Sequence, residues 1–105
     1  MSDRIAAIEA MLAKSPQDVF LHYSLGIEYA SVRRFAEAVE QFDQCINLDS
    51  DYIPAHIEAA KALRASGEAG QARGRFEHAL ELARKKGEGH TADSIRQQIE
   101  ALAGQ

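Results

Sequence analysis

The sequence has little of what disulfide-linked, metal-binding and membrane-spanning proteins need. It contains one cysteine, two prolines and no tryptophan. The single thiol, Cys45, forms no disulfide within the chain, and neither a His-x-x-x-His pair nor a cysteine pair offers the spacing of a metal site. No apolar run approaches the length of a membrane span. The sequence therefore predicts no bound metal and no insertion into a membrane.

The charge balance excludes further classes of partner. Acidic residues outnumber basic ones by 16 to 12, which gives a net charge of −4. Binding phosphate groups needs a concentrated positive field, so neither nucleic acid nor an anionic membrane is the expected partner. The N-terminus, with Asp3 beside Arg4, lacks the continuous apolar core of a secretory signal. The sequence predicts a cytoplasmic protein, with a longer precursor as the open alternative.

What the sequence does contain is an internal repeat with an offset of 34 residues. The first unit covers residues 18–52 and the second covers residues 53–86. Four aligned pairs are identical: His22 and His56, Ala38 and Ala72, Phe42 and Phe76, and Leu48 and Leu82. A period of this length is typical of helical hairpins that stack side by side and bury a face against each neighbour.

The apolar pattern within one repeat leads to the same architecture. Apolar residues recur at helical spacing over residues 18–32 and again over residues 36–48, which predicts two antiparallel helices. Gly26 and Ala38 are the small residues that let the two helix axes approach, and Phe42 fills the space between units.

These residues resemble the tetratricopeptide repeat (TPR), whose pattern runs from a bulky residue through Leu-Gly and Tyr to Ala and Phe. The first unit matches this pattern at His22, Leu25, Gly26, Tyr29, Ala38 and Phe42. The second unit matches it at His56, Ala59, Ala60, Leu63, Ala72 and Phe76. The resemblance implies an all-α fold, a right-handed α-α superhelix of about six helices, and a non-catalytic interaction module whose concave groove binds a peptide segment or partner protein.

The two ends of the chain fit terminal helices of such an array. At the repeat offset Ile8 aligns with Phe42, so the first helix is predicted to be the second half of a hairpin whose first half is absent. The last helix carries one apolar stripe over a polar remainder, as an end helix needs. The prediction is a single domain, residues 1–105, with a half-repeat helix at 2–14, repeats at 18–52 and 53–86, and a C-terminal capping helix at 91–103.

Two residues are predicted to cap helices. Ser15 is expected to begin the helix that follows it, with Pro16 in the first turn. Thr91 is expected to begin the last helix, after a break at Gly87.

The candidate catalytic residues all have a role in packing that accounts for them. His22 and His56 occupy equivalent places where a bulky inward side chain is required, so we interpret them as packing residues. Cys45 aligns with Ala79, which favours a compact buried residue over a reactive thiol. The glycines of residues 67–74 follow a helix and lack the Lys-Ser or Lys-Thr of a phosphate loop. The sequence predicts neither an enzyme nor a cofactor site.

The first helix of each repeat has a second face that its neighbours do not need. In the TPR family this face lines the concave groove, so the resemblance implies a groove that is apolar at one end and basic at the other. Such a groove suits a peptide with a hydrophobic anchor and an acidic flank. The residues of this predicted partner-binding groove are Phe20, Tyr23 and Ile27 on the first repeat, and Ile57, Lys61 and Arg64 on the second.

Two alternative roles for the apolar stripe stay open. A second copy of the chain could cover it, which would make the protein a structural homodimer or an assembly subunit. The C-terminal helix could also fold back over it. The TPR family's clamp for a terminal carboxylate is not carried over, because Tyr23 and Ile27 stand where its first Lys and Asn would be.

Overall fold

The computed structural model describes residues 2–104, which form six helices and no strand. This confirms the prediction of an all-α fold with about six helices. The helices are α1 (Ser2–Lys14), α2 (Val19–Ser31), α3 (Phe35–Leu48), α4 (Ile53–Ala65), α5 (Ala69–Lys85) and α6 (Gly89–Ala103).

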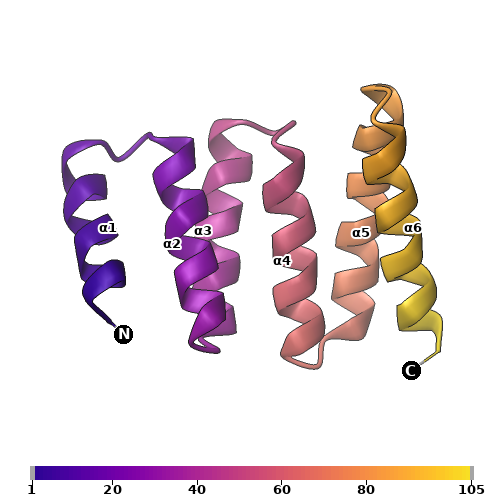
Figure 1. Ribbon diagram of the computed structural model, residues 1–105, viewed down its shortest axis with the longest axis horizontal. Helices are drawn as coiled ribbons and strands as arrows, with labels where there is room; N and C mark the ends of the chain where they lie inside the picture. Colours follow the sequence, from indigo (N-terminus) through magenta and orange to yellow (C-terminus); the bar gives the residue numbers. More distant parts are fainter. Residues whose placement is uncertain (1, 105) are drawn as a thin grey trace.

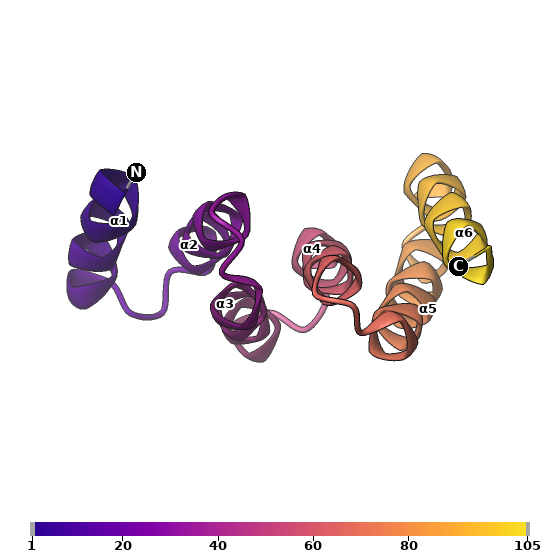
Figure 2. The same ribbon diagram turned by 90° about the horizontal axis from the view of Figure 1, so that it is seen from below.

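The helices pack as a row in chain order (Figure 1). Each helix from α2 to α5 packs against the helix before it and the helix after it, and α2 also touches α4. Seen from below, the row bends into an arch, with α2 and α4 nearer its inner side than α3 and α5 (Figure 2). The molecule measures 38 × 29 × 19 Å. A side chain on the inner face of α2 therefore lies on a surface shared with α4.

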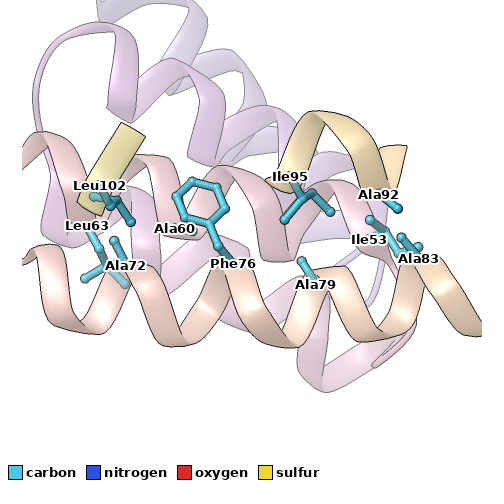
Figure 3. Close-up of a cluster of buried hydrophobic side chains, with 10 residues drawn as sticks. All are labelled: Ile53, Ala60, Leu63, Ala72, Phe76, Ala79, Ala83, Ala92, Ile95 and Leu102. Atoms are coloured by element: carbon cyan, nitrogen blue, oxygen red, sulfur yellow. The ribbon is translucent and has the colours of Figure 1, made fainter. Parts of the chain in front are cut away.

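Two buried clusters form the core, and each contains the phenylalanine of one repeat. The first cluster holds Phe42 and extends to Ala59 of α4, the second holds Phe76, and neither ring has any solvent exposure. In the second cluster Ile95 and Leu102 of α6 join residues of α4 and α5 (Figure 3). The last helix thus covers the second repeat.

The close approach predicted at Gly26 is present between α2 and α3. A Cβ atom on Gly26 would lie 2.5 Å from Cε1 of Phe42, well inside van der Waals contact. The aligned residue of the second repeat, Ala60, does carry a Cβ atom and is fully buried. The first repeat therefore packs its phenylalanine more tightly against the neighbouring helix backbone than the second.

The turns inside the two hairpins have the same backbone geometry but different residues. Gly67 adopts a φ of 91°, which glycine tolerates at little cost. The residue one repeat earlier is Arg33, and it adopts a φ of 64°. Its guanidinium group lies 5.3 Å from the centre of the Phe35 ring. A left-handed conformation is costly for a residue with a Cβ atom, so this turn holds strain that its counterpart lacks.

Both predicted helix caps are wrong. Asp18, not Ser15, caps α2: its Oδ1 accepts a hydrogen bond from the amide of Leu21 at 3.1 Å. The amide of Ser15 instead bonds the carbonyl of Met11 at 3.0 Å, so Ser15 continues the end of α1 and Pro16 lies outside α2.

The last helix begins before Thr91. Gly87 turns the chain with a φ of 72°. The carbonyl of the next residue, Glu88, then accepts the first hydrogen bond of the helix, from the amide of Ala92 at 2.9 Å. Helix α6 therefore begins at Gly89.

The two aligned histidines make equivalent hydrogen bonds. Nε2 of His22 donates to the carbonyl of Pro16 at 2.8 Å, and Nε2 of His56 donates to the carbonyl of Ser50 at 2.8 Å. Each bond ties the start of a repeat to the loop that precedes it. His56 is buried and His22 is partly buried. The packing interpretation is therefore correct, with a hydrogen bond that the repeat pattern did not indicate.

Helix α1, at the N-terminal end of the array, has one main neighbour. Helix α1 packs mainly against α2. Tyr29 Oη donates to Glu9 at 3.0 Å, and Arg4 pairs with Glu28 at 3.4 Å.

The C-terminal end presents polar residues to solvent. Three exposed side chains of α6 occupy positions whose counterparts on α4 are buried apolar residues. These residues are Asp93, Ser94 and Gln97, which align with Ala59, Ala60 and Leu63.

Candidate functional site

A hollow of about 250 Å³ opens on the surface of α2. We call it the α2 hollow and define it by its lining residues, which are Phe20, Tyr23, Ser24, Ile27 and Glu28. All five lie on one side of α2, because residues three and four apart share a helix face. The apolar stripe predicted from the sequence therefore lines a single concavity.

Phe20 and Tyr23 contribute to the α2 hollow in different ways. Phe20 is 65% exposed, which is more than the exposed fraction of Met11, Val32 or Leu48. The Tyr23 ring packs against two other aromatic rings, with centroids 5.8 Å from Phe42 and 5.6 Å from Tyr52. Tyr23 is thus a fixed wall of the hollow, whereas Phe20 is its free apolar rim.

The electrostatic surroundings of Tyr23 also differ from a purely apolar pocket. Burial raises the pKa of the Tyr23 phenol, and the negative charge of Glu58 raises it further. Glu58 lies on α4, so a carboxylate of the second repeat acts on the wall of the α2 hollow.

Both isoleucines of the predicted groove are partly buried. Ile27 packs against the first core cluster and Ile57 against the second. Ile27 lines the α2 hollow, whereas Ile57 is not among its lining residues, and both present less free surface than Phe20.

The two basic residues of the predicted groove already have partners within the chain. Lys61 Nζ lies 3.4 Å from Oε2 of Glu58. Arg64 donates to the side chain of Gln98 on α6, and its guanidinium lies 5.7 Å from the centre of the Phe76 ring. The structure thus places both residues on α4 but turns Arg64 toward the C-terminal end of the array.

Sequence reasoning missed the polar residues of this site, Ser24, Glu28 and Glu58. Ser24 and Glu28 lie four residues apart on α2, and each follows an apolar residue of the stripe. A search restricted to apolar spacing passes over such neighbours. The positions of the glutamates could have been found by testing the same helix face for charge.

The C-terminal helix does not cover the α2 hollow. Ile95 and Leu102 are buried in the second core cluster, and Ile99 packs against that cluster (Figure 3). Helix α6 packs on α5, at the opposite end of the row from α1 (Figure 1). The alternative in which α6 folds back over the stripe is therefore wrong.

The described residues offer little for catalysis or metal binding. The Cys45 thiol is buried, donates to the carbonyl of Val19 at 3.4 Å, and has a pKa raised to about 11 by burial. Its interpretation as a compact packing residue is confirmed. Within residues 2–104, no three histidine, cysteine, aspartate or glutamate side chains gather as a metal site would need. None of the described helices is both long and apolar enough to cross a bilayer.

Comparison with known proteins identifies the fold through structure and not through sequence. No protein-family model matches the sequence, and no curated protein matches it. A protein of Bordetella parapertussis with a known solution structure is 26% identical, with a TM-score of 0.86 over 98% of this chain and 90% of that chain.

Two further solved structures show the same arrangement of helices. The type III secretion translocator chaperone SycD of Yersinia enterocolitica is 19% identical, with a TM-score of 0.89 over 97% of this chain and 71% of that chain. The TPR2B domain of yeast Sti1, solved in a complex with pHsp70, is 22% identical, with a TM-score of 0.88 over 95% of this chain and 80% of that chain.

Proposed function

We propose that this chain, which has the fold of a small TPR domain, is a non-catalytic adaptor that holds a peptide segment of a partner protein. The segment lies along the inner face of the arch and places an apolar side chain in the α2 hollow. The predicted groove residues then form one binding surface: Phe20, Tyr23, Ile27, Ile57, Lys61 and Arg64.

The observation that carries this proposal is the exposed Phe20 side chain beside a concavity with a rigid aromatic wall. Exposed large apolar groups that border a hollow mark interaction sites more often than isolated ones do. The volume of about 250 Å³ is below the roughly 300–1,000 Å³ of ordinary small-molecule pockets, so an amino-acid side chain is a better fit than a cofactor.

The structural neighbours support a binding role without deciding the partner. The yeast domain was solved in a complex with pHsp70, and the Yersinia protein is a translocator chaperone. We propose that the same helical arrangement serves here to hold another polypeptide.

The arrangement of the candidate nucleophile and bases supports a role without catalysis. Cys45 is buried with a raised pKa, and Nε2 of both His22 and His56 is committed to a backbone carbonyl. A catalytic nucleophile needs a base within hydrogen-bond reach and access for the substrate.

Affinity capture from a native lysate with a matched pair of variants tests the proposal. Phe20→Asp places a charge on the rim of the hollow, whereas Leu48→Asp changes an exposed apolar residue at the end of α3. We expect the wild type and Leu48→Asp to retain a common partner that Phe20→Asp loses. A direct titration with that partner should give similar affinities for the wild type and Leu48→Asp and a weaker affinity for Phe20→Asp. Equal retention by all three proteins contradicts the groove as the binding surface.

A further inference from the structure

We propose that the segment held in the α2 hollow carries a basic residue beside its apolar anchor, and that Glu28 binds this residue. The inference rests on the proposed function and specifies the ligand of the same site. It differs from the acidic flank expected from the sequence, because the structure shows which charges border the hollow.

Among the described residues that line the α2 hollow, Glu28 is the only charged one. Its side chain is 21% exposed, so the carboxylate is partly removed from water. Its partner is Arg4, at 3.4 Å, and the Arg4 side chain is 79% exposed. Pairs with such an exposed member contribute little to stability. A cation on a bound ligand can therefore replace Arg4 at low cost.

A second carboxylate, that of Glu58 on α4, acts on the wall of the hollow. Glu58 raises the pKa of Tyr23, which places its negative charge within electrostatic reach of the wall. Neither positive group of α4 is among the residues that line the hollow. Lys61 is paired with Glu58, and Arg64 is bonded to Gln98 on α6.

Charge complementarity thus favours an apolar anchor with a neighbouring Lys or Arg. A ligand carboxylate at the same place would lie beside Glu28 and would have to compete with Glu58 for Lys61. Like charges brought together in this way oppose binding.

Two short probe peptides test the inference. They are the acetylated and amidated peptides Gly-Lys-Leu-Leu-Lys-Gly and Gly-Glu-Leu-Leu-Glu-Gly, which share an apolar centre. Binding is followed by changes in the backbone amide NMR signals of Phe20, Tyr23 and Glu28 during titration. We expect the basic peptide to bind about fivefold more tightly at low salt, and the difference to shrink as salt is added.

Variants of the ion pair give opposite results if Glu28 binds the ligand cation. Glu28→Gln should remove most of the preference for the basic peptide. Arg4→Ala should increase it, since it removes the competing cation. Glu77→Gln is the matched control, because it changes the net charge equally but lies on α5, where Glu77 pairs with Arg73.

The outcomes separate this inference from the proposed function. Equal binding of both peptides at the α2 signals, or tighter binding of the acidic peptide, overturns the inference and leaves the adaptor function intact. Absence of any shift at α2 with either peptide overturns both. A preference that survives in Glu28→Gln also overturns the inference, since the preference then arises elsewhere.

Discussion

At the scale of single residues, the contact between Gly26 and Phe42 governs how closely α2 and α3 pack. Gly26→Ala would place a Cβ atom 2.5 Å from a ring that is fully buried, so the ring or the helix would have to shift. We expect this substitution to lower the free energy of unfolding by about 1–3 kcal/mol, as overpacking does. Denaturant unfolding followed by circular dichroism measures the change.

A compensating variant checks the cause of that loss. Phe42→Leu shortens the side chain, so adding it to Gly26→Ala should cost less than the sum of the two single changes. Strict additivity would show that the ring does not cause the strain. The second repeat is the control, because Ala60→Gly creates no overpacking and should cost about 1–2 kcal/mol through helix propensity and the loss of one buried methyl group.

The buried imidazole of His56 should make stability depend on pH. Burial lowers the pKa of His56 below its ordinary value of 6.5, and His78 and Arg75 lower it further, against the opposing bond to Ser50. The unfolded chain takes up a proton near pH 6.5 while the folded chain resists it. The contribution of the neutral ring is therefore present above pH 6.5 and is lost as the pH falls below it.

Unfolding measured at about pH 7.5 and about pH 5.5 tests this dependence, with an effect of about 1.4 kcal/mol for each unit of pKa shift. We expect His56→Gln to weaken the dependence. The same slope in wild type and His56→Gln would assign the pH effect to other groups.

The sequence predicted the buried residues of this array better than their polar contacts. Phe42, Phe76, Gly26 and Cys45 all occupy the packed positions that the repeat pattern indicated. The partners of Lys61 and Arg64 did not follow from the pattern, because long flexible side chains choose among neighbours that only the fold brings near.

At the scale of an element, the turn between α2 and α3 carries the strain of a left-handed arginine. Arg33→Gly should remove a conformational cost of about 1–2 kcal/mol from the folded state. Two losses should offset part of this gain: the contact with Phe35 disappears, and glycine has greater freedom in the unfolded chain. We expect a net gain of about 0.5–1 kcal/mol in thermal or denaturant unfolding. Gly67→Ala should be destabilising at the equivalent turn, and a loss of stability in Arg33→Gly would show that the Phe35 contact outweighs the strain.

Helix boundaries were the weakest sequence prediction, for a physical reason. Ser15 and Asp18 are both good caps, and local propensity does not choose between them. The end of α1 decides between them, because a carbonyl of α1 accepts a hydrogen bond from the amide of Ser15. Asp18 is then the residue that caps α2.

At the scale of the whole molecule, the proposed binding of a partner segment in the α2 hollow predicts a monomer, because a self-interface would occupy the same face. Phe20 is highly exposed, so Phe20→Ala should change neither the mass in solution nor the stability by more than about 0.5 kcal/mol. Tyr23→Ala is a poorer test, because Tyr23 packs against Phe42 and Tyr52 and its loss opens the core. Sedimentation or light scattering at micromolar concentration gives the mass. A dimer that Phe20→Ala dissociates would instead support the structural homodimer.

The polar face of α6 limits how copies of this molecule can assemble. Head-to-tail addition, in which one copy continued the helical row of the next, would press Asp93, Ser94 and Gln97 against another chain. Each polar group left without a partner in such a contact would cost about 1–3 kcal/mol. A heterologous contact that does not close on itself generates filaments. We therefore expect these three side chains to oppose fibre growth from this end of the molecule.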